Sequence, residues 1–243
     1  MYERRAYRDW KGSEDLDGFT ATVKETDLFI RADKNIQTQA IEAIIRHRTP
    51  LEKYIEENRE FLTSLEPVQV APTAPEIVKI MAEAGARAGV GPMAAVAGTL
   101  AELVGNDLLK FSREIIVENG GDIFLKIRKQ RSIGIYAGKS PFTGQLTVEI
   151  EPDETPLGVC TSAGTVGHSL SFGKADAVTV MAESAALADA AATAIGNCVK
   201  SREDIQPALE FGGRIEKLRG IIIIVGDKIG CWGSVRLGKG GKE

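Results

Sequence analysis

Apolar residues recur along this chain with two periods, those of strands and of helices, and they predict a mixture of both elements. The stretch FTATVKETDLFIRAD, residues 19–33, reads as two short strands joined by a polar turn at Glu25 to Asp27. A helix is predicted over 36–48, where alanine and isoleucine line one face. The run TPLE at 49–52 is typical of a helix start, with a capping threonine and a first-turn proline, so a second helix is predicted from there to Leu62.

The rest of the chain is predicted to alternate between short helices and strands. Prolines interrupt residues 66–75, EPVQVAPTAP, which therefore form a loop and a candidate boundary. Helices rich in small residues are predicted over 75–89 and 92–105, and a strand, a glycine turn and a strand over 114–128. The later elements are predicted as strands at 132–138, 144–151 and 177–182, a third alanine-rich helix over 184–200, and a strand pair after Gly220.

One pattern occurs twice: an alanine-rich helix is followed by apolar strand residues, a glycine turn and an aspartate. The two copies contain IIVENGGDI in the middle of the chain and IIIVGDKIG near its end. This repetition favours a duplicated α+β architecture. The chain is predicted to be a single domain over 1–243, with two packed halves as the alternative and a boundary near 66–75 or 140–156.

Composition and charge narrow the class of protein. The chain has 243 residues, of which 43% are hydrophobic and 26% charged, as in ordinary globular proteins. A net charge of -4 provides no basic surface for nucleic acid. The N-terminus is charged from its third residue, and no stretch approaches the ~20 apolar residues of a membrane helix, so we expect no signal peptide, no membrane contact and a cytoplasmic location.

The cysteines fit the same location. Cys160, Cys198 and Cys231 are odd in number and widely spaced, which is typical of reduced thiols rather than of disulfides or a zinc site. Cys198 and Cys231 are predicted to be packing residues, and His47 to be solvated among arginines. The sequence leaves open whether the chain forms a homo-oligomer.

Asp189 and Thr193 are the first candidate site residues. They lie four residues apart in the alanine-rich helix, which Ser184 is placed to cap, so both project from one face of it. Carboxylate and hydroxyl oxygens are ligands that Mg²⁺ accepts, with phosphate and water completing the shell. The alternative is a solvent-facing aspartate and a threonine bonded back to its own helix.

The turn NGGD, Asn119 to Asp122, also allows two interpretations. Its exposed backbone N–H groups could meet a phosphate or a carboxylate. Asn-Gly is equally the strongest short signal for a hairpin turn, and a plain hairpin turn without a ligand is the favoured interpretation when the motif is taken alone.

The loop GVCTSAGTVGH, residues 158–168, combines a thiol, three hydroxyls and a histidine. Cys160 would be a nucleophile if a positive group held it as thiolate, and His168 is close enough in sequence to fold back onto it. The alternative is a buried, inert cysteine at the end of a strand.

The loop, the strand DAVTVMA and the alanine-rich helix ADAAATAIGN together resemble the ApbE superfamily of flavin-transferase-like proteins. In that family a G-[IV]-A-T-S-G loop precedes a strand reading S-V-T-V and a helix reading A-D-A-L-A-T-A. The similarity is best over 157–196, and NGGDI at 119–123 fits the family's glycine-rich turn. The wording CTSAGTVGHSLSFGKADAVTV resembles a compact branch of the superfamily that has no assigned reaction.

The resemblance implies a duplicated α+β fold of antiparallel sheets and alanine-rich helices with a ligand cleft between its layers. It implies that Asp189 and Thr193 ligate magnesium. It also implies that the cleft binds a small-molecule ligand through two segments, namely Asn119, Gly120 and Gly121 of the turn, and Thr161, Ser162, Ala163 and Gly164 of the loop.

Three departures separate this chain from the flavin-transferring members. The family's H-x-x-D-P-x-T-G segment is reduced to TVGHSLSFGKAD, a lysine-glycine step is replaced by AVAGT, and Cys160 stands where alanine is usual. These differences speak against FAD or FMN as the ligand.

Three functions therefore remain on the sequence. The first is an enzyme that holds a phosphate or carboxylate through Mg²⁺, with Cys160 and His168 supplying group- or sulfur-transfer chemistry. The second is a protein that binds or transfers a flavin nucleotide, and the third is a ligand-binding module without catalysis.

Overall fold

A computed structural model describes residues 15–164 and 173–240 of the chain. Within these residues, most strands form one antiparallel sheet of eight strands in the order β1-β2-β3-β4-β7-β8-β9-β10. Its strands are β1 (Asp17–Val23), β2 (Thr26–Ala32), β3 (Ile115–Asn119), β4 (Asp122–Lys126), β7 (Leu157–Ser162), β8 (Ala177–Ala182), β9 (Leu218–Val225) and β10 (Lys228–Gly233). A second antiparallel sheet contains β5 (Arg131–Gly134), β6 (Leu146–Ile150) and β11 (Leu237–Lys239), in the order β11-β6-β5.

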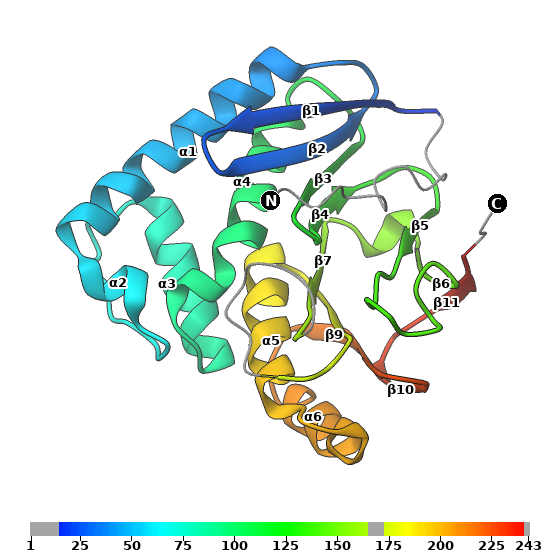
Figure 1. Ribbon diagram of the computed structural model, residues 1–243. Helices are drawn as coiled ribbons and strands as arrows, with labels where there is room; N and C mark the ends of the chain where they lie inside the picture. The colour runs from blue at the N-terminus through cyan, green and yellow to red at the C-terminus, as the bar shows by residue number, and fades with distance from the viewer. Residues whose placement is uncertain (1–14, 165–172, 241–243) are drawn as a thin grey trace.

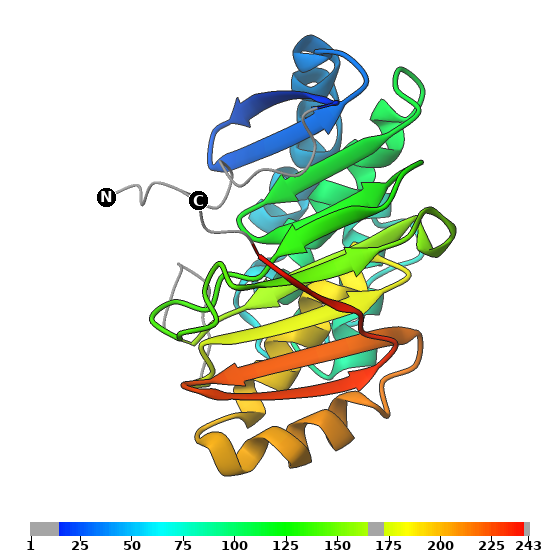
Figure 2. The same ribbon diagram turned by 90° about the vertical axis from the view of Figure 1, so that its right-hand side faces the viewer.

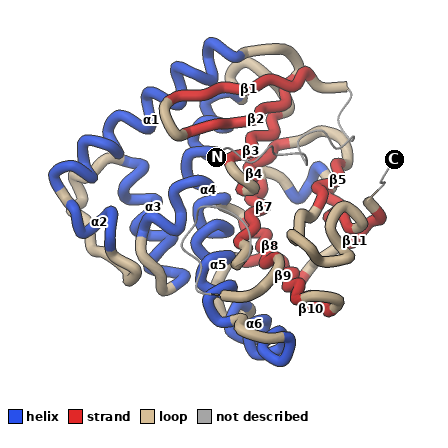
Figure 3. The backbone as a smooth tube through the Cα atoms, in the orientation of Figure 1, coloured by secondary structure: helices blue, strands red, loops and turns tan. Residues whose placement is uncertain are grey.

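The helices cover one face of the large sheet, and the small sheet lies on the other face (Figures 1 and 3). Figure 2 shows the large sheet from the side of the small one, with the helices behind it. The helices are α1 (Gln37–Glu57), α2 (Arg59–Thr63), α3 (Glu76–Ala88), α4 (Val96–Leu108), α5 (Ala185–Cys198) and α6 (Ile205–Gly212), and the 3₁₀ turns are η2 (Pro92–Ala95), η3 (Pro152–Glu154) and η4 (Arg202–Asp204). This arrangement confirms the predicted α+β class with antiparallel sheets and alanine-rich helices.

The large sheet continues past both predicted boundaries. β4 pairs with β7 across the segment 140–156, and the loop 66–75 joins α2 to α3 within the helical layer. The duplication and the single domain stay predictions.

The small residues of α4 and α5 let both helices approach the sheet closely, which is what positions the candidate site. A Cβ atom on Gly158 of β7 would lie 2.3 Å from the Cα atom of Ala185 in α5. A Cβ atom on Gly105 of α4 would lie 2.3 Å from the ring of Phe124 in β4. Larger side chains at these contacts would push α4 and α5 away from β4 and β7.

One helix takes the place of the predicted helices 36–48 and 49–62. α1 runs from Gln37 to Glu57 with Pro50 inside it, and α2 follows directly after Asn58. A proline removes one helical hydrogen bond, but buried residues on both sides of it, Ile44 and Leu51, hold the helix against the core. The prediction of a helix start at Thr49 was therefore wrong because tertiary packing outweighs this local signal.

Two boundaries in the strands also differ from prediction. The turn between β1 and β2 consists of Lys24 and Glu25, with Lys24 at φ 52°, and Asp27 already belongs to β2. Asp27 is buried and its carboxylate accepts a hydrogen bond from the hydroxyl of Thr22 at 3.1 Å, so this polar residue fits a strand rather than a turn. The strand predicted over 132–138 is short, since β5 ends at Gly134.

The helical layer holds no single membrane-length span among the described residues. The pair Glu76–Ala88 and Pro92–Leu108 reaches the length and composition of a span together, but it is bent by 104°.

Candidate functional site

Segments distant in sequence meet at the first turn of α4. The side-chain amide of Asn119, at the end of β3, donates a hydrogen bond to the carbonyl of Ala97 at 3.1 Å. The backbone N–H of Gly98 donates to the Oδ2 atom of Asp189 in α5 at 2.9 Å. The N-terminus of α4 thus joins the β3–β4 turn to the alanine-rich helix, and it brings two of the predicted site residues together.

The β3–β4 turn is a hairpin turn, as the favoured interpretation of NGGD predicts. Gly120 and Gly121 form it with φ values of 70° and 109°, a conformation that glycine adopts readily. The N–H of Gly121 donates to the Oε1 atom of Glu118 at 2.9 Å. A Cβ atom on Gly121 would lie 3.8 Å from the carbonyl oxygen of Thr161, so the turn lies beside the end of β7.

Asp122, the last residue of NGGD, is the site residue that the sequence analysis missed. Burial raises the pKa of Asp189 well above its usual value, and the neighbouring Asp122 carboxylate raises that pKa further. The N–H groups of Gly98 and Ala97 act in the opposite direction on the same pKa. Two carboxylates therefore share a partly buried position, where a proton or a cation would relieve their repulsion.

Cys160 is buried completely between β7 and α5. Its thiol donates to the carbonyl of Ala185, with 3.4 Å between Sγ and the oxygen. Burial raises the pKa of Cys160 well above its usual value, and the charges of Asp122 and Asp189 raise it further. The thiol lies away from solvent and its raised pKa disfavours the thiolate, which favours the buried, inert cysteine among the two interpretations that the sequence left open.

The predicted TSAG loop is divided between the two faces of the large sheet. Side chains two apart on a strand share a face, so Ser162 lies on the α5 side with Cys160, while Thr161 lies on the opposite side. The hydroxyl of Thr161 is hydrogen-bonded to that of Thr179 on β8 at 2.9 Å. Ser162 faces the C-terminal part of α5, because a Cβ atom on Gly196 would lie 3.6 Å from its Oγ atom.

The end of the loop is held by its backbone. The N–H of Gly164 donates to the carbonyl of Ala175 at 2.9 Å, and a Cβ atom on Gly164 would lie 2.2 Å from the carbonyl oxygen of Gly173. Ala163, directly before it, is partly exposed. Thr161 therefore contributes only its backbone to the α5 face of the sheet, and Ser162 is the loop residue whose side chain lies on that face.

Thr193 and His168 are the two remaining residues that the sequence predicts for the site. Thr193 is partly buried on α5, one turn after Asp189, as its spacing predicts. His168 lies outside the described residues, so the predicted pairing of Cys160 with His168 stays a prediction.

The donor set at Asp122 and Asp189 fits a hard cation. Among residues 15–164 and 173–240, no group of three or more His, Cys, Asp or Glu side chains is arranged to hold a metal by itself. Mg²⁺ does not need such a group, because it is commonly bound by one or two carboxylates and takes its other ligands from water and phosphate. Two carboxylates with the hydroxyl of Thr193 one turn along α5 are therefore compatible with magnesium.

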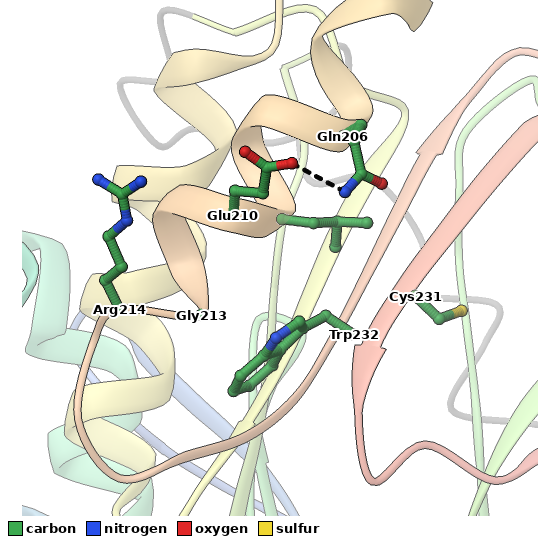
Figure 4. A pocket seen from close by; sticks show the side chains of 7 residues that line it. Gln206, Glu210, Gly213, Arg214, Cys231 and Trp232 are labelled. Carbon is green, nitrogen blue, oxygen red and sulfur yellow. Dashed lines mark hydrogen bonds between the residues drawn. The ribbon is translucent and has the colours of Figure 1, made fainter.

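Two surface hollows, each of about 330 Å³, lie away from these carboxylates. Figure 4 shows the hollow between α6 and β10, where the indole ring of Trp232 lies below Gln206 and Glu210, whose side chains are hydrogen-bonded to each other. The second hollow lies between α1 and the loop before α3, around Tyr54. Neither hollow contains a residue predicted for the site.

Three other predictions about polar residues need correction. Cys198 and Cys231 are exposed and not packed in the core, because α5 ends at Cys198 and β10 is an edge strand. His47 is largely buried, with 16% of its side chain exposed, and its Nε2 atom lies 2.9 Å from the Oδ2 atom of Asp107 in α4. This contact ties α1 to α4 and does not reach the candidate site.

Comparisons with known proteins show the family to which the chain belongs. A family model described as "AbpE bacteria" matches residues 8–229. A UPF0280 protein of Methanocaldococcus jannaschii is 48% identical over 219 residues, which cover 88% of this chain and 89% of that protein. A UPF0280 protein of Methanosarcina acetivorans is 43% identical over 216 residues, covering 88% and 85%.

Solved structures show the same fold at low identity. The apo flavinyl transferase ApbE of Pseudomonas stutzeri superposes with a TM-score of 0.55 at 14% identity, covering 89% of this chain and 94% of that one. An ApbE protein of Thermotoga maritima gives a TM-score of 0.53 at 13% identity, covering 88% and 96%. The chain therefore belongs to the UPF0280 family and, by family model and fold, to the ApbE-like superfamily.

Proposed function

We propose that the chain binds a phosphate-bearing small molecule through a divalent cation held at Asp122 and Asp189. The placement of these two carboxylates beside the first turn of α4 carries the proposal. Like charges in a partly buried position repel each other, and a bound Mg²⁺ would replace that repulsion with attraction. The hydroxyl of Thr193, one turn along α5, is the third protein ligand that we assign.

The surroundings of the two carboxylates suit a phosphate. α4 begins here, and its N-terminus carries a partial positive charge that favours an anion, although Asp189 already accepts the N–H groups of Ala97 and Gly98. Gly120 and Gly121 bring backbone close to this point without side chains. We assign the phosphate to the space that these glycines border.

Cys160 has no chemical step in this proposal, because its thiol is buried and its pKa is raised. Sulfur transfer through this residue is therefore set aside. Asn119 acts as a support: its amide holds the β3–β4 turn against the carbonyl of Ala97.

Binding or transfer of a flavin nucleotide is the second candidate function. The flavinyl transferase fold extends over about nine-tenths of this chain, which favours FAD or FMN as the ligand. The sequence departures noted above favour another phosphate-bearing molecule. A flavin would bind at the same cation and would make the purified protein yellow.

The experiment that tests the first function is a thermal-shift titration with Mg²⁺ alone, and then with Mg²⁺ together with FMN, FAD or ADP. We expect a phosphate ligand to raise the melting temperature of the wild type only in the presence of Mg²⁺. In Asp189→Asn and in Asp122→Asn, neither Mg²⁺ nor the phosphate ligand should change the melting temperature. The matched control is Asp153→Asn, which removes an exposed carboxylate from η3 and should respond as the wild type does. A Mg²⁺-dependent shift that survives in both site variants would place the ligand elsewhere.

The same titration separates the two candidate functions. A shift with FMN or FAD and none with ADP favours the flavin nucleotide. Mass spectrometry of a mixture incubated with FAD then separates binding from cleavage of the FAD pyrophosphate, which releases AMP. The FMN group appears as an added mass on a hydroxyl-bearing protein or peptide acceptor if it is transferred, and as free FMN if water is the acceptor. Intact FAD in a complex that forms and dissociates would identify a binding protein.

A further inference from the structure

Helices α4 and α5 each cap the N-terminus of the other. Asp189 of α5 accepts the N–H of Gly98 in the first turn of α4, at 2.9 Å. In return, the Oε2 atom of Glu102 in α4 accepts the N–H of Ala185, the first residue of α5, at 2.7 Å. Each carboxylate thus satisfies N–H groups that a helix start leaves without a helical partner.

The contact of Glu102 involves three donors. The hydroxyl of Ser184, the N-cap residue of α5, donates to the same Oε2 atom at 2.8 Å, and the N–H of Ala186 donates at 3.3 Å. One oxygen atom of α4 therefore fixes the first turn of α5. Ser184 keeps its own role as the cap of α5 by accepting the N–H of Leu187 at 3.4 Å.

The two contacts lie one helical turn apart. Gly98 and Glu102 are four residues apart on α4, and Ala185 and Asp189 are four residues apart on α5, so the helices run antiparallel with matched turns. A Cβ atom on Gly98 would lie 2.2 Å from the carbonyl oxygen of Ala185 and 2.9 Å from the Cβ atom of Asp189. Backbone contact at Gly98 leaves little space for α5 to slide or rotate against α4.

We propose that Glu102 is a positioning residue for the cation site. It fixes the first turn of α5 and thereby holds the Asp189 carboxylate against Gly98 and beside Asp122. Glu102 does not touch the cation itself. This inference rests on the proposed function of Asp122 and Asp189.

The first test measures Mn²⁺ affinity by isothermal titration calorimetry on the full chain. Residues that orient a metal ligand typically change affinity by 10–100-fold, so we expect Glu102→Ala to weaken Mn²⁺ binding by about tenfold or more. Glu102→Gln keeps a side-chain carbonyl that can accept the N–H of Ala185, and it should retain most of the affinity. Equal losses in both variants would mean that Glu102 acts through its charge, which overturns the inference.

Two control variants distinguish a loss of Mn²⁺ affinity caused by a displaced α5 from one caused by a general loss of stability. Ile30→Val in β2 lowers stability at a distance from α5, and Glu83→Ala removes an exposed carboxylate from α3. Both should bind Mn²⁺ as the wild type does. Wild-type affinity in Glu102→Ala, with a lowered melting temperature, would make Glu102 a merely structural residue.

The second test needs no metal. Hydrogen exchange followed by NMR should show that Glu102→Gln preserves and Glu102→Ala loses protection of the Gly98 amide, while Val104 and Gly105 of α4 stay protected. If Glu102→Ala does not fold, Glu102→Asp, whose carboxylate is one methylene shorter, should show the same local loss. Unchanged protection of Gly98 overturns the inference. If the wild type binds no Mn²⁺, the proposed function is wrong, but the positioning role of Glu102 is still tested. The hydrogen-exchange protection of the Gly98 amide in the Glu102 variants then shows whether Glu102 positions α5.

Discussion

Asp189 is partly buried beside a second carboxylate, and this should make the stability of the protein depend on pH. Its pKa is raised above the usual value of 3.8, so the folded protein binds the proton more tightly than the unfolded chain does. The stabilisation from the protonated carboxyl group is complete below the unfolded pKa and is lost as the pH rises through the folded pKa. The loss amounts to about 1.4 kcal/mol for each pH unit between the two pKa values.

Urea unfolding of Asp189→Asn at several pH values tests this. Without divalent cations, the variant should lose less stability than the wild type between about pH 4 and about pH 8, because it lacks the titrating group. Asp153→Asn should follow the wild type throughout. A wild type that gains stability relative to Asp189→Asn over this range would show that the pKa is lowered and not raised.

The three thiols should differ in reactivity. Cys198 and Cys231 are exposed, whereas Cys160 is completely buried with a raised pKa. In the folded protein, a thiol reagent such as DTNB should react with two cysteines and reach the third only after denaturation. Peptide mapping would assign the sites, and rapid labelling of Cys160 in the folded protein would restore it as a candidate nucleophile.

At the scale of elements, the contact between α4 and α5 depends on one glycine. A Cβ atom on Gly98 would meet the backbone of Ala185, so Gly98→Ala should lower the free energy of unfolding by about 1–3 kcal/mol and weaken cation binding at Asp189. Gly89 is the matched control, since it ends α3 at φ 74° with no neighbouring atom within 4 Å. Gly89→Ala should cost about 1–2 kcal/mol through backbone strain and leave cation affinity unchanged.

Equal cation affinity in Gly98→Ala and Gly89→Ala would show that the close contact between α4 and α5 does not determine the geometry of the cation site. Calorimetric titration with Mn²⁺ at a temperature where both variants are folded makes the comparison.

The sequence predicted several elements of the site because their signals are local. Ser184 caps α5 as its position indicates, and Gly120 and Gly121 form the hairpin turn that Asn-Gly favours. Asp122 was missed because its approach to Asp189 depends on the pairing of β4 with β7 and on α5 packing over both. No local pattern records such a pairing.

Two other differences have the same physical origin. Pro50 carries a local signal for a helix start, yet the buried side chains on both sides of it keep α1 continuous. Cys160 sits in a loop-like sequence rich in glycine and hydroxyls, yet its strand is covered by α5, which buries the thiol. In both cases tertiary contacts outweigh the local pattern.

At the scale of the whole molecule, an ion-pair network around the buried Arg131 joins the two sheets. Arg131 of β5 is only 5% exposed and donates to Glu114, directly before β3, at 2.9 Å and to Asp15, before β1, at 2.6 Å. Arg131→Met would leave the buried Glu114 without this partner, and we expect a loss of about 3–5 kcal/mol in the free energy of unfolding.

Two further variants test whether the unpaired charge of Glu114 causes the loss of stability in Arg131→Met. Adding Glu114→Leu to Arg131→Met should recover much of the loss, because no buried charge then remains unpaired. Lys129→Met removes an exposed partner of Asp15 and should change stability by less than about 1 kcal/mol. Chemical denaturation measures all three, and an Arg131→Met protein as stable as Lys129→Met would mean that the network does not hold the sheets together.

The most direct test of the central claim is the stoichiometry of Mn²⁺ binding, followed by calorimetry or by the Mn²⁺ electron paramagnetic resonance signal. The wild type and Asp153→Asn should each bind one Mn²⁺ per chain, and Asp122→Asn and Asp189→Asn should each abolish that site while remaining folded. One Mn²⁺ bound with unchanged affinity by Asp189→Asn, or none bound by the wild type, would contradict a cation site at these two carboxylates.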